Sequence, residues 1–241
     1  YSMQGEWAKA IENYKMSLVY DTNSYRSHFR LAGEYVRAGL VSQAVEHCEL
    51  SLKANPQFSE AHVLLSSLHS VLGFHEKARK GYRKLLQMEP GNQEAALLLG
   101  ATYVDEGKMD QAIKYFESLV KKSQSPHVVW YYIGRTYLQK QPISLDNAEV
   151  AFRASVRLQP QFVQSVLELG SIYEKRGQNE KARQLFEVYQ KNYGPDVTVA
   201  ENLVQLYLGD SNYAKAYEQL KVINELDQGN LNAQLKMAFI L

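Results

Sequence analysis

WYYIGRTY, at residues 130–137, places a glycine in the middle of an aromatic run with a helical pattern. Glycine in a helix interior costs about 1 kcal/mol relative to alanine, so its position needs a structural reason. Related octapeptides start at residues 28, 62, 96 and 130, which are 34 apart, and two more follow at 166 and 200. They read HFRLAGEY (28–35), HVLLSSLH (62–69), ALLLGATY (96–103), VLELGSIY (166–173) and AENLVQLY (200–207). Such a fixed period indicates a repeat architecture.

A second element follows each octapeptide and begins with alanine. It reads AVEHC (44–48), ARKGY (78–82), AIKYF (112–116), AEVAF (148–152), ARQLF (182–186) and AYEQL (216–220). Prolines close several repeats, at Pro56, Pro90, Pro126, Pro160 and Pro195.

The pattern W-x2-L-G-x2-Y, then A-x3-F, then P, with a 34-residue period, resembles the tetratricopeptide repeat family. The resemblance implies an all-α fold, a right-handed superhelical solenoid of stacked helix-turn-helix repeats. We expect a single solenoid over 1–241, in which residues 1–24 end one repeat and residues 231–241 start another. Between them, full repeats are expected at 25–58, 59–92, 93–126, 127–162, 163–196 and 197–230.

We call the equivalent position in each repeat a slot, and the slot of Gly134 is the glycine slot. It then has a packing reason, because a small residue lets a neighbouring helix backbone approach closely. Gly100, Gly134 and Gly170 share this slot with Ala32 and Ser66, whereas the larger Val204 predicts looser packing in the sixth repeat. The longer turn of the fourth repeat contains Pro142, and Asp146 with Glu149 reads as a capping box that restarts the helix. Left-handed caps are expected at the ends of first helices, at Gly39, Gly73, Gly107 and Gly177.

Composition excludes several classes of function. Hydrophobic residues make up 45% and the net charge is +1, which fits a folded chain without the basic field that nucleic acids select. No apolar run is long enough to span a membrane. The only cysteine, Cys48, excludes an internal disulfide framework. These features favour a cytoplasmic protein, and a bacterial periplasmic one would also fit.

The motifs of hydrolase nucleophiles, phosphate loops and zinc proteases do not occur, so we expect no catalytic residue, no cofactor and no metal site. Histidines and Cys48 crowd into the first two repeats, where a zinc site is conceivable. The repeat explains four of them as packing residues and leaves two as surface residues. The packing set is His28, Cys48, His62 and His69, and the surface set is His47 and His75.

The family resemblance implies that first helices form a concave inner wall, which binds partners in such solenoids. The expected wall is apolar, with Tyr131 and Arg135 as the pairing that interface hot spots favour. We expect it to bind an extended protein or peptide segment or an amphipathic helix, although some of these residues could simply pack between helices. The candidate residues are Arg26, Phe29, Val63, Ser67, Leu97, Ala101, Val104, Tyr131, Arg135, Leu138, Leu167, Ser171 and Glu174.

Two specialities of the family find no support in this wall. The slots of the clamp for acidic chaperone tails hold residues that cannot bind a carboxylate: Phe29, Gly33, Leu64, Glu94 and Leu98. An asparagine ladder is missing as well, because Asn202 stands alone.

The two ends lack the polar capping helices that solenoids need for solubility. We expect either a truncation of a longer chain or self-association into a homo-oligomer through apolar residues of the last helix. Those residues are Leu231, Leu235, Met237 and Phe239. The function predicted overall is a non-catalytic scaffold for protein binding and complex assembly. The alternative is the recognition arm of a larger enzyme whose catalytic domain lies outside this chain.

Overall fold

The computed structural model describes the backbone of residues 3–240 and the side chains of residues 7–239. Residues 1, 2 and 241, which belong to the predicted partial repeats, lie outside the described residues. Within that range the regular structure is helical, which confirms the all-α prediction. The helices are α1 (Met3–Tyr20), α2 (Tyr25–Arg37), α3 (Val41–Ala54), α4 (Ser59–Val71), α5 (His75–Met88), α6 (Gln93–Asp105), α7 (Met109–Val120), α8 (Pro126–Gln139), α9 (Leu145–Leu158), α10 (Val163–Lys175), α11 (Asn179–Tyr193), α12 (Val197–Gly209), α13 (Tyr213–Leu226) and α14 (Leu231–Ile240).

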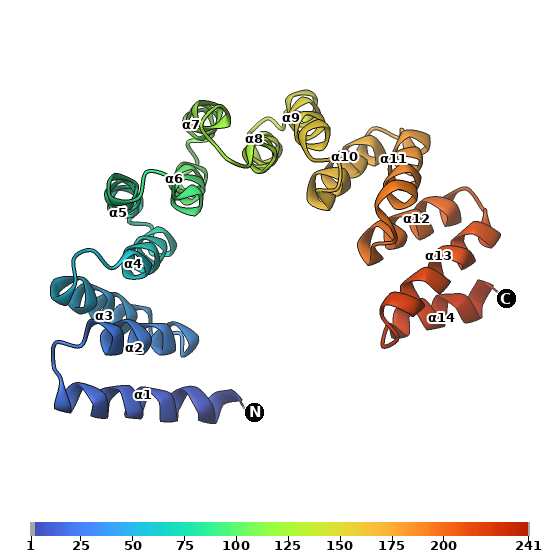
Figure 1. Ribbon diagram of the computed structural model, residues 1–241. Helices are drawn as coiled ribbons and strands as arrows, with labels where there is room; N and C mark the ends of the chain where they lie inside the picture. The colour runs from blue at the N-terminus through green and yellow to red at the C-terminus, as the bar shows by residue number, and fades with distance from the viewer. Residues whose placement is uncertain (1–2, 241) are drawn as a thin grey trace. The chain divides into compact units, whose positions relative to one another are not determined.

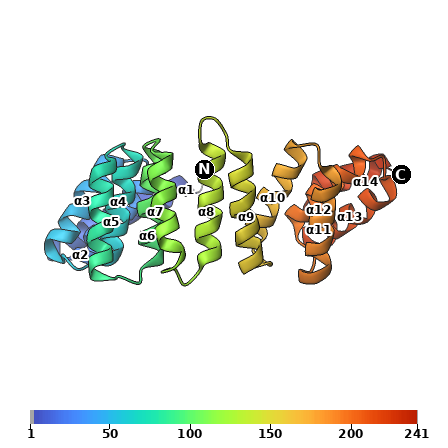
Figure 2. The same ribbon diagram turned by 90° about the horizontal axis from the view of Figure 1, so that it is seen from above.

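The chain divides into two compact units, Tyr1–Leu119 and Val120–Leu241, and each is described by itself. Unit 1 contains α1 to α7, and unit 2 contains α8 to α14. Within each unit, consecutive helices pack against one another as a series of hairpins (Figures 1 and 2). That the whole chain is one solenoid stays a prediction.

The glycine of WYYIGRTY accommodates an aromatic ring. A Cβ atom at Gly134 would lie 2.7 Å from two ring atoms of Phe152 on the second helix of the same hairpin. The atoms nearest to this Cβ position belong to the ring, so the ring is what a larger residue at 134 would meet first. Equivalent pairs are Gly100 with Phe116 and Gly170 with Phe186.

In the first and sixth repeats the first-helix slot holds a residue larger than glycine, and the second-helix slot holds one smaller than phenylalanine. Ala32 shares a core cluster with Cys48, and Val204 shares one with Leu220. Because interiors are close-packed, the larger valine is offset by a leucine in place of phenylalanine. Val204 is only 1% exposed, and looser packing in the sixth repeat stays a prediction.

The ends of the first helices follow the expected turn chemistry. Gly39, Gly73, Gly107 and Gly177 have φ between +68° and +79°, which confirms the left-handed caps. Ser211 takes the same place in the sixth repeat with φ +56°.

The capping box predicted for α9 is wrong. Ser144 precedes the helix, and its side chain makes no capping hydrogen bond. Asp146 and Glu149 both form ion pairs with Arg176 on the next hairpin instead. Sequence spacing alone could not distinguish a local cap from a contact between repeats.

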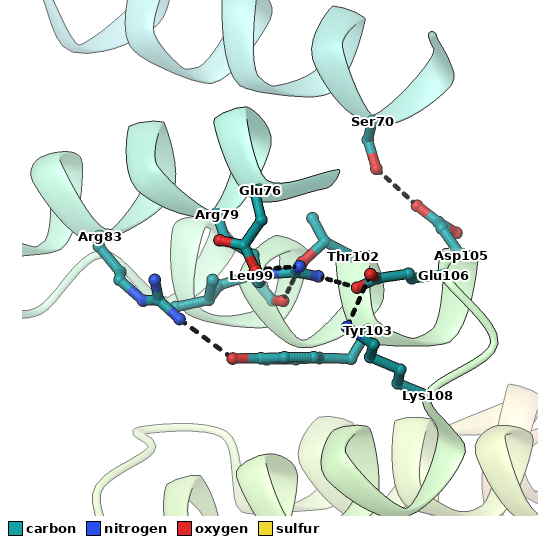
Figure 3. Close-up of polar contacts among 10 residues, drawn as sticks. All are labelled: Ser70, Glu76, Arg79, Arg83, Leu99, Thr102, Tyr103, Asp105, Glu106 and Lys108. Carbon is teal, nitrogen blue, oxygen red and sulfur yellow. Dashed lines mark hydrogen bonds and ion pairs between the residues drawn. The ribbon is translucent and has the colours of Figure 1, made fainter. Parts of the chain in front are cut away.

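A buried arginine joins the second and third repeats (Figure 3). Arg79 on α5 is 1% exposed, and its guanidinium lies 4.7 Å from the ring centre of Tyr103 on α6. It donates to Glu76 Oε1 and to Glu106 Oε2, both at 2.5 Å. Lys108 and then Arg79 lower the pKa of the Glu106 carboxyl, which keeps it ionised. A buried charge is tolerated only when it is paired in this way.

The same arrangement recurs between the fifth and sixth repeats. Arg183 on α11 occupies the slot of Arg79 and pairs with Glu180 and with Asp210 beyond α12. Its guanidinium lies 6.0 Å from the ring centre of Tyr207.

Between the fourth and fifth repeats the charges of two slots are exchanged. Glu149 takes the place of the arginine on the second helix, and Arg176 takes the place of the acid after the first helix. One pair of positions therefore links successive hairpins with either polarity.

Candidate partner-binding faces

The predicted wall residues lie on first helices in both units, and none of them is buried. Arg26 and Arg135 are exposed, and the remaining positions are half-buried. Half-burial fits an accessible wall whose side chains also support the hairpins. In unit 1 they lie on α2 (Arg26, Phe29), α4 (Val63, Ser67) and α6 (Leu97, Ala101, Val104); in unit 2 they lie on α8 (Tyr131, Arg135, Leu138) and α10 (Leu167, Ser171, Glu174).

Several unit 1 wall residues are held by neighbouring helices. The ring of Phe29 meets Phe58 edge to face, with centroids 5.0 Å apart. The Ser67 hydroxyl lies 2.8 Å from the hydroxyl of Tyr82, and Val63 packs against the core cluster around Tyr82. Packing therefore accounts for part of the role of these side chains.

In unit 2, Tyr131 and Arg135 form a supported polar pair. The ring of Tyr131 lies edge to face on Phe162, with centroids 5.6 Å apart. Arg135 Nη1 donates to the Tyr131 hydroxyl at 3.3 Å and to Glu168 Oε1 at 3.0 Å. Glu168 was missed by the sequence reasoning because it lies on the next hairpin. The pair is thus oriented, and the Arg135 side chain remains 46% exposed.

Glu174 is an incompletely satisfied acid on the same set of helices. Its Oε1 atom is buried and has no hydrogen-bond partner. Burial raises the pKa of its carboxyl above the ordinary value. A donor from outside the chain would satisfy this oxygen, and unsatisfied buried acceptors are costly.

A polar cavity of about 350 Å³ lies among α12, α13 and α14 of unit 2. Asn202, Asn230 and Asn232 line it, so the statement that Asn202 stands alone is wrong in space. Two of these amides serve the backbone, because Asn202 donates to Thr198 and Asn230 caps α14. Such proximity could not be seen from one register of wall positions, since Asn230 lies in a turn.

The histidines of the first repeats have structural partners. His28 Nε2 donates to the Thr22 carbonyl at 3.1 Å, and His62 Nε2 donates to the Pro56 carbonyl at 2.9 Å. His28 Nδ1 therefore accepts from His47 Nδ1 at 2.9 Å. Burial, followed by His28, lowers the pKa of His47.

The packing prediction is confirmed for the first set, since His28, Cys48, His62 and His69 are buried. The surface prediction is wrong for His47 and His75, which are half-buried. Burial raises the pKa of the Cys48 thiol to about 12, so it stays protonated near neutral pH. Residues 3–240 contain no group of three metal-ligating side chains.

The last helix exposes part of its predicted association surface. Leu231, Leu235 and Phe239 are 71%, 61% and 89% exposed on α14. Met237 packs against the core cluster around Val204 instead. Across the described helices, none combines the length and apolar character that crossing a bilayer requires.

Family models support the prediction of a repeat protein. Two models described as tetratricopeptide repeat match residues 73–130 and 144–197. The chain is a tetratricopeptide repeat protein. Comparison with curated proteins yields no match.

Solved structures show the same fold at low sequence identity. The C-terminal part of a tetratricopeptide repeat-containing protein from Cytophaga hutchinsonii has a TM-score of 0.60 at 18% identity, covering 98% of this chain and 96% of that one. A tetratricopeptide repeat protein from Parabacteroides merdae has a TM-score of 0.59 at 17% identity, covering 99% and 94%. The Cut9–Hcn1 hetero-tetramer of the APC/C contains a chain with a TM-score of 0.56 at 17% identity, covering 99% of this chain and 47% of that one. Tetratricopeptide repeats generally bind proteins, so a protein-interaction scaffold is supported in general terms.

Proposed function

We propose that the protein is a non-catalytic scaffold that holds a partner segment on the first-helix face of unit 2. This face consists of Tyr131, Arg135, Leu138, Leu167, Ser171 and Glu174. Its half-buried leucines offer apolar contacts to an extended segment or an amphipathic helix. Tyr131 is fixed by Phe162, so little conformational entropy is lost when a partner contacts it.

The unpartnered Oε1 atom of Glu174 carries this proposal. The chain itself leaves this acceptor unpaired, and a partner's backbone N–H or cationic side chain on the first-helix face would satisfy it once the Glu174 side chain rotates out of its buried position. Arg135 is exposed and is oriented by Tyr131 and Glu168. Its guanidinium can only donate hydrogen bonds, so it would donate to a partner carboxylate or carbonyl. The face thus offers both an acceptor and a donor around an apolar strip.

Negative charge introduced on the first-helix face should weaken partner capture without unfolding the protein. We expect Arg135→Glu combined with Ser171→Glu to weaken binding of the protein captured from native extract at least about ten-fold. Lys191→Glu, on the exposed side of α11, is the matched control and should bind normally. Affinity is measured by titration of the captured protein, and melting temperature confirms folding. Unchanged affinity in the folded double variant would reject this face.

The exposed side chains of α14 favour a second role, self-association. Leu231, Leu235 and Phe239 form an accessible apolar group that a second copy could cover. We expect the solution mass to fall towards that of a monomer on dilution, and Leu235→Lys to shift this transition to higher concentration. A strict monomer at high protein concentration would exclude this role.

A further inference from the structure

Unit 2 has a groove that shares no residue with the first-helix face. Its volume is about 680 Å³, and its lining comes from α8, α9, α10 and α11. Trp130, Val150, Tyr173 and Leu185 supply much of its apolar and aromatic surface. Within unit 2 these four helices follow one another along the chain (Figure 1). We call this site the α9–α11 groove.

Two arginines stand at this groove, one helical turn apart on the exposed side of α9. Arg153 and Arg157 both line it, and no carboxylate is among its described lining residues. Arg153 lies 3.5 Å from Glu149, but that carboxylate also pairs with Arg176, and the Arg153 side chain remains 67% exposed. Arg157 forms no ion pair among the described residues. Arg157 therefore gives the groove a positive charge without an ion-pair partner, while Arg153 belongs to a cluster in which Arg176 also pairs with Asp146.

We propose that the α9–α11 groove binds an acidic amphipathic segment of a partner protein. Its apolar side chains would contact Trp130 and Leu185, and its carboxylates would lie at Arg153 and Arg157. Arginine is well suited to this role, since its planar donors match a carboxylate in two contacts. The charge complementarity sets the preferred partner, while apolar burial supplies affinity.

A peptide segment fits this groove better than other classes of ligand. The groove is open to solvent, so a bound backbone would keep its hydration on one side while its side chains are buried. Nucleic acid requires a longer basic track than two arginines. Because the first-helix face and the groove have no residue in common, each can be tested separately and both can be occupied together.

Trp130 provides an internal reporter for this site. The chain has two tryptophans, Trp7 and Trp130, so Trp7→Phe leaves the groove residue as the sole tryptophan fluorophore. The probe is a synthetic amphipathic helix with leucines on one face and glutamates on the other. Its control has the same leucines with lysine in place of each glutamate. We expect a saturable change in Trp130 emission with the glutamate peptide and binding that weakens as salt increases.

Charge reversal at the groove decides the assignment. Arg153→Glu combined with Arg157→Glu should weaken binding of the glutamate peptide at least about ten-fold, whereas Lys191→Glu should leave it unchanged. Arg135→Glu separates the two faces, because only binding at the first-helix face should respond to it. No saturable change up to about 1 mM peptide, equal affinity for the lysine peptide, or loss of binding in Arg135→Glu alone would each overturn the proposal.

Discussion

Gly134→Ala should destabilise the protein, whereas Gly33→Ala should stabilise it. Both glycines lie inside first helices, and alanine is the better helix former by up to about 1 kcal/mol. At Gly33 nothing lies within 4 Å of the added Cβ atom, so the helical gain is realised. At Gly134 the Cβ atom would lie 2.7 Å from the ring of buried Phe152, and overpacking should cost about 1–3 kcal/mol. Denaturant unfolding measures both changes.

A second substitution identifies the cause of the loss at Gly134. In a Phe152→Leu background the ring that occupies the Cβ position is gone, so Gly134→Ala should lose most of its penalty. Val204 with Leu220 shows that the fold accepts this combination of larger and smaller residues. If Gly134→Ala destabilises equally with phenylalanine or leucine at 152, the ring is not the obstacle.

Exchange of the charges at Arg79 and Glu106 should restore stability that either reversal alone destroys. Arg79→Glu puts a second acid beside Glu106 and removes the buried cation, which should cost on the order of 3 kcal/mol. Glu106→Arg places two guanidiniums together and should also be destabilising. The double variant recreates the polarity of Glu149 with Arg176.

The control for this exchange is built into the chain. Glu76 remains acidic in the double variant, as Asp146 is beside Glu149. All four proteins carry Lys108→Gln, because Lys108 pairs with Glu106 and the same slot of the fifth repeat holds Gln178, so the resulting charges match those between the fourth and fifth repeats. Thermal unfolding of the four proteins gives the coupling between the two positions. A double variant no more stable than the worse single one would show that the slots do not act as a pair.

Most of the fold could be predicted from the 34-residue repeat period. It located the helices because glycine, alanine and aromatic slots recur where hairpins must interdigitate, and Gly39 or Gly107 mark turns that need positive φ. These are local requirements, which a sequence displays directly. The packing role of Cys48 and His62 followed for the same reason, since the slot defines the environment.

Contacts between repeats were harder to predict. Asp146 and Glu149 matched a capping box by spacing, but their partner Arg176 lies on another hairpin. His47 was assigned to the surface because nothing local indicated His28 as its partner. The α9–α11 groove likewise needs four helices, so no single motif predicts it. Residues that act across hairpins become visible only when the repeats are compared slot by slot in three dimensions.

In each hairpin a second-helix side chain packs on the first-helix residue at the position of Gly134, and this residue is glycine where the partner is phenylalanine. Nuclear Overhauser contacts between glycine Hα protons and phenylalanine ring protons, in protein labelled at these two residue types, test it most directly. The structure predicts contacts from Gly134 to Phe152, from Gly100 to Phe116 and from Gly170 to Phe186, with none from Gly33 to any of these rings. A folded protein in which Gly134 shows no contact with the Phe152 ring would contradict the account.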